Sequence, residues 1–246
     1  MTAAALKALH VPGKPLVLPN AWDADTAKLV EAAGFPVVAT SSVAVAAALG
    51  FPDGEEAPAG EMFAAAARIV KAVGIPVTVD AESGYGLSGA ELAGRLLDAG
   101  AVGCNFEDTD HGTGQVRPVA EQAERIAALR EAAGDGLVIN ARVDSFRGVD
   151  AHEAMADGVA RAKAYLEAGA DCVYPIHLRT PESIAEFVQG VGGAAVNAPA
   201  WPGNPGIAAL AELGVARISL GGGLWQFVRK QLEATLAGVA EGKLPY

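Results

Sequence analysis

The chain repeats one pattern along its length. A stretch rich in Ala, Leu and Glu with helical spacing ends at a glycine, and a short run of β-branched and apolar residues follows. Glycine readily adopts the left-handed conformation that ends many helices, so each of these glycines marks a helix-to-strand turn. The pattern predicts seven such turns, at Gly34, Gly74, Gly100, Gly134 or Gly136, Gly169, Gly192 or Gly193, and Gly214.

Seven turns separate eight predicted strands. Most of these strands are continuous apolar runs, which is typical of parallel strands that are buried on both faces. Eight alternations of helix and strand in 246 residues match the count and size of a (β/α)8 TIM barrel, and we predict one such domain over residues 1–246. A doubly wound parallel sheet is the alternative. The predicted strands are residues 16–20, 37–41, 77–82, 103–108, 137–144, 172–177, 194–200 and 217–221.

The composition excludes several classes of protein. The chain is 51% hydrophobic and 19% charged, which supports a large core. Its formal net charge of −11 argues against nucleic-acid and anionic-membrane partners. No apolar run has membrane-spanning length, and residues 1–10 lack the pattern of a signal peptide. Cys104 and Cys172 lie in apolar runs and are predicted to be core residues without a disulfide, so we expect a cytoplasmic protein.

Acidic residues gather where the predicted strands end. Asp80 and Glu82 are two positions apart on the third strand, so their side chains point to the same face. Glu107 ends the fourth strand, and Asp53 lies in the loop after the second. Carboxylates placed so close repel one another unless a cation lies between them, and oxygen ligands suit Mg²⁺. The sequence therefore predicts a Mg²⁺ site, with a solvated acidic rim as the alternative.

Two basic side chains accompany these acids. Arg142 lies within the fifth strand, where it could form a buried salt bridge to Asp80 or Glu107 or a bidentate clamp on a substrate carboxylate. His177 ends the sixth strand and is either a structural histidine or a donor to substrate. No lysine lies on a predicted strand, so Schiff-base chemistry in the barrel mouth is not expected.

Eight segments of the chain resemble the isocitrate lyase and phosphoenolpyruvate mutase superfamily. They occur in the family's order and at the same places on the strands, from about Leu16 to the helix after Gly223. The resemblance implies a barrel that binds an α-keto acid or its enolate against a divalent cation. The matching segments are residues 20–23, 32–35, 49–53, 80–86, 106–108, 141–144, 168–171 and 213–215.

The resemblance also implies roles for individual residues. The cofactor would be Mg²⁺ or Mn²⁺, with Asp80 as a direct ligand and Glu82, Glu107 and Asp53 acting directly or through bound waters. The backbone N–H groups of Ser42 and Val43 would bind the substrate carboxylate, and Arg142 would be the substrate-binding arginine. Asp80 would also contact the substrate at the metal, and His177 and Asn197 would line the pocket. Relatives usually pack their last helix onto a neighbour, so a homo-oligomer, dimer or tetramer, is expected.

The loop after the fourth strand departs from the family pattern. Residues 109–118 contain neither the cysteine that serves the lyases as acid/base nor the lysine of the mutases, where Thr109 stands. His111 could carry the proton instead, or it could be an ordinary loop histidine. We therefore predict Arg142, His111 and Glu107 as catalytic residues.

The expected function is that of a Mg²⁺-dependent carbon–carbon lyase. It would cleave the bond beside the keto or hydroxy carbon of a small carboxylic acid through a metal-stabilised enolate, as oxaloacetate decarboxylases and methylisocitrate lyases do. Decarboxylation needs the least help at the leaving group, so it tolerates the altered loop best. The alternatives are P–C bond chemistry, as in a phosphonomutase or phosphonopyruvate hydrolase, and a non-catalytic barrel that binds keto acids.

Overall fold

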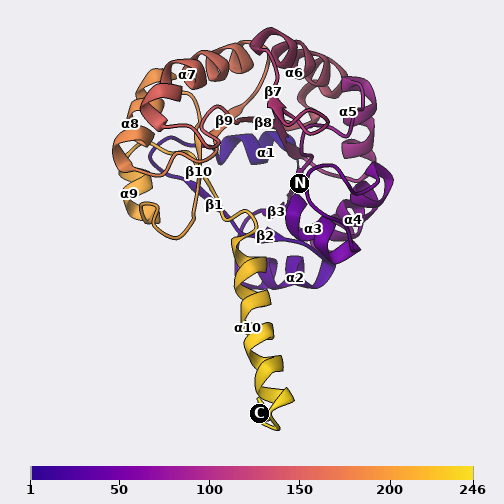
Figure 1. Ribbon diagram of the computed structural model, residues 1–246. Helices are drawn as coiled ribbons and strands as arrows, with labels where there is room; N and C mark the ends of the chain where they lie inside the picture. Colours follow the sequence, from indigo (N-terminus) through magenta and orange to yellow (C-terminus); the bar gives the residue numbers. More distant parts are fainter. Residues whose placement is uncertain (1, 246) are drawn as a thin grey trace.

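A computed structural model describes residues 2–245, and its parallel strands surround a common axis with helices outside them (Figure 1). Six strands form one continuous sheet in the order β2-β3-β4-β5-β8-β9, and three more form the sheet β1-β11-β10. The barrel strands are β1 Leu16–Leu18, β2 Asn20–Ala21, β3 Val38–Thr40, β4 Val77–Asp80, β5 Gly103–Glu107, β8 Val138–Val143, β9 Cys172–Pro175, β10 Asn197–Pro199 and β11 Arg217–Ser219.

The two sheets close into one barrel. A parallel bridge between Val173 and Val196 joins β9 to the segment that leads into β10. On the other side β1 and β2 are consecutive pieces of the first predicted strand, separated by Pro19, which has no N–H to give to a ladder. The fold is therefore the predicted (β/α)8 barrel.

Helices cover the outside of the barrel (Figure 1). Helix α1 is the exception. Its Leu6 lies in one apolar cluster with Leu16 and Val138, the first residues of β1 and β8, so α1 packs on the amino-terminal end of the barrel. The helices are α1 Ala3–Ala8, α2 Ala24–Ala32, α3 Ser42–Leu49, α4 Ala59–Ala72, α5 Gly89–Asp98, α6 Val119–Ala133, α7 Ala151–Glu167, α8 Pro181–Gly190, α9 Ile207–Glu212 and α10 Gly223–Ala240, with a 3-10 turn at Gly134–Gly136.

The structure corrects some predicted details. The seventh strand covers only Asn197–Pro199 instead of residues 194–200. The loop expected at 109–118 contains a short antiparallel hairpin, β6 Thr109–Asp110 and β7 Gln115–Val116. Gly74 does not have a positive φ, because α4 ends at Ala72 and the Gly74 N–H donates to Glu31 at 2.8 Å.

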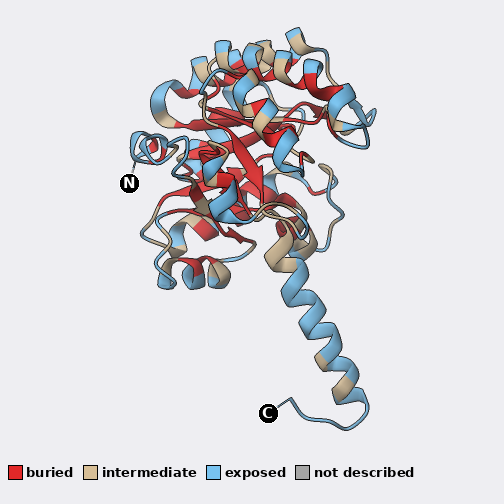
Figure 2. Ribbon diagram, turned by 90° about the vertical axis from the view of Figure 1, so that its left-hand side faces the viewer, coloured by how far each residue is buried: buried red, intermediate tan, exposed pale blue. Residues whose placement is uncertain are grey.

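Both cysteines are fully buried and free, which confirms them as core residues. The last helix differs from the others, since α10 projects away from the barrel and none of its described residues is buried (Figures 1 and 2). No helix within residues 2–245 combines the length and apolar character that a bilayer crossing requires.

Candidate active site

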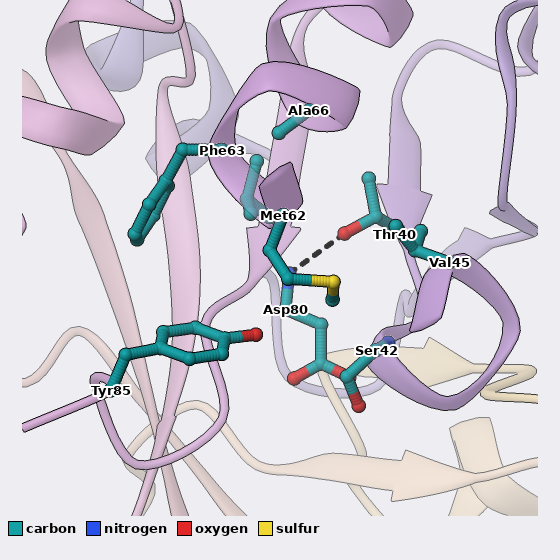
Figure 3. Close-up of a pocket in the computed structure, with 9 residues that line it drawn as sticks. Thr40, Ser42, Val45, Met62, Phe63, Ala66, Asp80 and Tyr85 are labelled. Atoms are coloured by element: carbon teal, nitrogen blue, oxygen red, sulfur yellow. Dashed lines mark hydrogen bonds between the residues drawn. The ribbon is translucent and has the colours of Figure 1, made fainter. Parts of the chain in front are cut away.

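Asp80 ends β4 at the carboxyl end of the barrel, and its neighbours fix its orientation (Figure 3). The Asp80 N–H donates to Thr40 Oγ1 at 2.9 Å, and Asp80 Oδ2 accepts a hydrogen bond from the Ser42 N–H at 3.0 Å. Among residues 2–245 no hydrogen bond to Asp80 Oδ1 is formed. The carboxylate is thus held by one oxygen and can offer the other to a ligand.

The Ser42 amide has a different partner from the one expected. It was predicted to bind a substrate carboxylate, but here it donates to Asp80. Val43 follows in the first turn of α3, where backbone N–H groups have no partner inside the helix. The start of α3 therefore supports Asp80 through the Ser42 N–H and leaves the Val43 N–H without a partner inside the helix.

Glu82 is 2% exposed, and it lies beyond the strand on which it was expected. The strand β4 ends at Asp80 and Glu82 has a φ of 47°, so the predicted shared strand face of the two acids is wrong. Oε2 accepts hydrogen bonds from the backbone N–H groups of Gly54 and Glu55, at 3.0 and 2.7 Å, and Oε1 accepts one from the Tyr85 hydroxyl at 2.8 Å. Burial raises the pKa of Glu82 to about 7, although the Tyr85 hydrogen bond opposes the shift. Glu82 holds the loop that carries Asp53.

Glu107 ends β5 and connects two predicted catalytic residues. Its Oε2 forms an ion pair with Arg142 Nη1, and its Oε1 lies 2.6 Å from His111 Nε2 on the hairpin. Burial raises the pKa of Glu107 to about 7, with Arg142 and His111 opposing the shift. The hydrogen bond to Glu107 in turn raises the pKa of His111. The pair is suited to hold a proton near neutral pH.

Arg142 is held by acids on two sides. Its Nε and Nη2 donate to the two carboxylate oxygens of Asp144, at 2.7 and 2.8 Å, while Nη1 pairs with Glu107. The predicted salt bridge from Arg142 to Glu107 is present, and among residues 2–245 Arg142 forms none with Asp80. The Thr109 hydroxyl also donates to Asp144. A guanidinium has five N–H groups, so two remain for a substrate carboxylate.

His177 and Asn197 lie at different depths in the barrel, with Asn197 fully buried and His177 only partly so. His177 has a φ of 75°, and its ring lies 5.2 Å from that of Trp201, on which Arg179 stacks at 5.0 Å. Burial lowers the pKa of His177, so its neutral form is favoured. Asn197 is fully buried inside the barrel and donates to Ser219 Oγ at 3.1 Å.

A Mg²⁺ site fits this set of donors. Within residues 2–245 no three His, Cys, Asp or Glu side chains converge closely enough to enclose a metal ion. Mg²⁺ commonly binds through one or two carboxylates and keeps several waters, which suits one held carboxylate with a free oxygen at Asp80. Asp53 lies in the loop that Glu82 holds, and partial burial together with the neighbouring Asp80 carboxylate raises its pKa.

Three residues near the site were not among the predicted site residues. Thr40 and Tyr85 orient Asp80 and Glu82, and Glu55 accepts hydrogen bonds from the Ser83 hydroxyl and the Tyr85 N–H at 3.0 and 2.6 Å. Tyr85 lies between two glycines directly after the acids, which is a usable sequence signal. Nothing in the local pattern marks Glu55. Met62, Phe63 and Tyr85 also line a small, mainly apolar cavity beside Asp80 (Figure 3).

The chain is similar in sequence and in structure to proteins of one family. The family model for phosphoenolpyruvate phosphomutase matches residues 6–240. A crystal structure of a candidate phosphonomutase from Burkholderia cenocepacia J2315 is 42% identical, with a TM-score of 0.89 over 96% of this chain and 99% of that one. A 2-methylisocitrate lyase from Bacillus subtilis is 31% identical over 72% of this chain and 60% of its own.

A third relative was solved with ligands. A phosphonopyruvate hydrolase in complex with oxalate and Mg²⁺ is 26% identical, with a TM-score of 0.85 over 99% of this chain and 89% of that one. Lyases, mutases and hydrolases thus share this barrel. The family match over nearly the whole chain is decisive, and the protein belongs to the isocitrate lyase/phosphoenolpyruvate mutase superfamily.

Proposed function

We propose that the protein is a Mg²⁺-dependent lyase that cleaves the carbon–carbon bond beside the keto or hydroxy carbon of a small carboxylic acid. The observation that carries this proposal is the position of Glu107, whose carboxylate contacts both Arg142 and His111. This arrangement combines a cation for a substrate carboxylate with a proton carrier. Both reactions need the cation to bind the substrate. Cleavage of a 2-hydroxy acid needs the proton carrier twice, first to accept the hydroxyl proton and then to protonate the product, whereas decarboxylation of a keto acid needs it only for the final protonation.

Asp80 would hold the metal directly, and Glu107, Asp53 and Glu82 would act through bound waters. Mg²⁺ (or Mn²⁺) supplies a Lewis acid that stabilises negative charge on an enolate oxygen. Because Glu82 already accepts three hydrogen bonds, we assign it the smallest part in metal binding. The Mg²⁺ bound to the phosphonopyruvate hydrolase relative supports the choice of metal.

The residues of this chain can carry out the remaining steps. The free N–H groups of Arg142 and the N–H of Val43 would bind a carboxylate and fix the bond to be broken. Asn197 and His177 would border the same pocket. In decarboxylation of a keto acid, the C–C bond would break with loss of CO2, its electron pair would move to the keto oxygen to give an enolate, and protonated His111, paired with Glu107, would give its proton to the enolate carbon. In cleavage of a 2-hydroxy acid, His111 would first accept the hydroxyl proton, and the hydroxyl carbon would become the keto carbon of one product. The electron pair of the broken bond would go to the other fragment, and His111 would return its proton to that carbon.

A second candidate is chemistry at a P–C bond. The candidate phosphonomutase at 42% identity favours it. Thr109 argues against it, because its hydroxyl donates to Asp144 and it cannot supply the cation expected of a mutase at this position. The remaining alternative is a barrel that binds keto acids without turning them over.

One substrate panel separates these possibilities. Purified protein with Mg²⁺ is given oxaloacetate, methylisocitrate, isocitrate and phosphonopyruvate, and release of pyruvate, glyoxylate or phosphate is measured, with Asp80→Ala as the control. The proposal expects pyruvate or glyoxylate from a carbon substrate, and no release with EDTA or in Asp80→Ala. Phosphate release from phosphonopyruvate alone would support the second candidate. An absence of turnover, with oxalate and Mg²⁺ still raising the Tm, would support the binding protein.

The protein is also proposed to form a homo-oligomer through α10. This helix projects from the barrel (Figure 2). Four of its exposed apolar residues recur at helical spacing along one face, namely Val228, Leu232, Leu236 and Val239. Each is between 41% and 57% exposed, so this face is apolar and uncovered in one chain. A second copy of the chain is the proposed occupant, in keeping with the resemblance to oligomeric relatives.

A further inference from the structure

Two loops at the mouth of the barrel hold each other by reciprocal hydrogen bonds. One loop follows α3 and carries Asp53, and the other is the turn after β4. The backbone N–H groups of Gly54 and Glu55 donate to Glu82 Oε2. In return, Glu55 Oε1 accepts from the Ser83 hydroxyl at 3.0 Å and from the Tyr85 N–H at 2.6 Å. Each loop thus supplies both a carboxylate and backbone donors.

The backbone at this junction is held in an uncommon conformation. Glu55, Glu82 and Tyr85 have φ values of 63°, 47° and 55°, in the left-handed region that residues other than glycine seldom adopt. Such conformations persist where the surrounding contacts over-determine them, and they cluster at functional sites. The reciprocal hydrogen bonds are the contacts that do so here.

The same loop also passes close to His111, the proposed proton carrier. Gly54 has a φ of 92°, and a Cβ added there would lie 3.3 Å from Nδ1 of His111. The other ring nitrogen, Nε2, is the one that contacts Glu107. The loop that carries Asp53 is therefore also a neighbour of the His111 ring.

We infer that Glu55 is a positioning residue that fixes Asp53 and His111 for the reaction, by clamping the Asp53 loop to the turn after β4. Glu55 is assigned no direct contact with metal or substrate, because its carboxylate is bound to Ser83 and Tyr85. Its effect runs through the backbone of residues 53–55, which its side chain ties to Ser83 and Tyr85. The inference rests on the proposed function, because it assigns Asp53 to the metal site.

The contact between the two loops requires a hydrogen-bond acceptor oxygen at residue 55, and it does not require a negative charge there. Both hydrogen bonds end on the same oxygen, Oε1, which a glutamine side chain also possesses. Glu55→Gln therefore keeps the clamp, and Glu55→Ala removes it. Glu56→Ala is the matched control, because Glu56 is the exposed neighbour in the same loop.

The test measures Mg²⁺ affinity and loop protection together. Isothermal titration of Mg²⁺ in the presence of oxalate should show an affinity loss of roughly 10–100-fold in Glu55→Ala, which is the range for residues that orient metal ligands. Glu55→Gln and Glu56→Ala should stay close to the wild type. In the metal-free protein, hydrogen exchange of the Gly54 and Glu55 amides should be slow in the wild type and in Glu55→Gln, and fast in Glu55→Ala.

Two outcomes would overturn the inference. In one, Glu55→Ala lowers the Tm but leaves Mg²⁺ affinity and amide exchange unchanged, as a merely structural residue would. In the other, Glu55→Gln is as impaired as Glu55→Ala, which would make the charge and not the hydrogen-bond acceptor decisive. Failure of the proposed function looks different, because wild-type protein would then bind no Mg²⁺ with oxalate while the amide exchange still followed the clamp.

Discussion

His111 Nε2 lies 2.6 Å from Glu107 Oε1, so the hairpin after β5 places an imidazole directly against the carboxylate at the end of that strand. The loop after β5 lacks the cysteine of the lyases and the lysine of the mutases, as its sequence shows, and His111 is the titratable side chain that it places against Glu107. The same Glu107 carboxylate contacts Arg142. If the proposed roles of Arg142 and His111 hold, substrate binding and proton transfer are coupled through this one side chain.

His111→Gln should remove the proton carrier without disturbing the metal site. We expect kcat to fall by about 10²–10⁴-fold, the usual contribution of general acid–base catalysis, with little change in Mg²⁺ affinity. Steady-state kinetics on the substrate found by the panel would measure this. His152→Gln on α7 is the control, since His152 is exposed. Wild-type kcat in His111→Gln would refute a catalytic role.

Stability should depend on pH through His10. Burial lowers the pKa of His10 from 6.5 to about 4, while its Nδ1 hydrogen-bonds the Leu6 carbonyl. The folded state therefore resists protonation, and the unfolded chain takes up the proton first. The contribution of His10 to the free energy of unfolding is at its full value above pH 6.5 and is lost as the pH falls toward about 4.

Urea unfolding of wild type and His10→Gln between pH 4 and pH 7.5 isolates this contribution. The difference between the two unfolding free energies should change across the window from 6.5 to about 4, with wild type losing more on acidification. Parallel curves for the two proteins would contradict the assignment. His152→Gln should give a curve parallel to that of wild type.

Packing of α5 against α6 can be tested with two glycines of the same helix. A Cβ on Gly89 would lie 2.6 Å from the Ala128 carbonyl carbon and 2.7 Å from the Leu129 nitrogen, so Gly89→Ala should destabilise the fold by about 1–3 kcal/mol or more. A Cβ on Gly94 meets nothing within 4 Å, and Gly94→Ala should stabilise the helix by up to about 1 kcal/mol. Chemical denaturation measures both, and equal effects would contradict the packing.

Charge on the apolar face of α10 should dissociate the proposed oligomer. Leu232→Glu places a carboxylate on a face where Leu232 is 55% exposed in one chain. Analytical ultracentrifugation should show wild type as a dimer or tetramer and Leu232→Glu as smaller species. Leu29→Glu is the control, because Leu29 on α2 is 64% exposed outside this face. A monomeric wild type would refute the assembly.

The barrel was predictable because its signals are local and repeated. Helix-ending glycines and buried strands recur along the chain, and the carboxyl ends of parallel strands necessarily meet at one end of a barrel. That topology alone brings Asp80, Glu107 and Arg142 together, as expected. The structure shows their placement, and their roles in binding and catalysis remain our proposals.

The loops were much harder to predict. The hairpin of β6 and β7 has two-residue strands, too short for any periodicity to reveal. The commitment of Glu82 to Gly54 and Glu55 depends on the left-handed backbone of three non-glycine residues, which no propensity favours. Likewise Arg142 and Asp144 share a face by their spacing, but the bidentate contact between them depends on rotamers.

Calorimetric titration of oxalate tests the central claim most directly, because oxalate resembles the enolate of a keto acid and needs no turnover. If Asp80 anchors Mg²⁺ for a keto-acid substrate, oxalate should bind wild type only when Mg²⁺ is present, and Asp80→Ala should show no binding under either condition. Equal oxalate binding with Mg²⁺ and with EDTA, or unchanged binding in Asp80→Ala, would contradict the account.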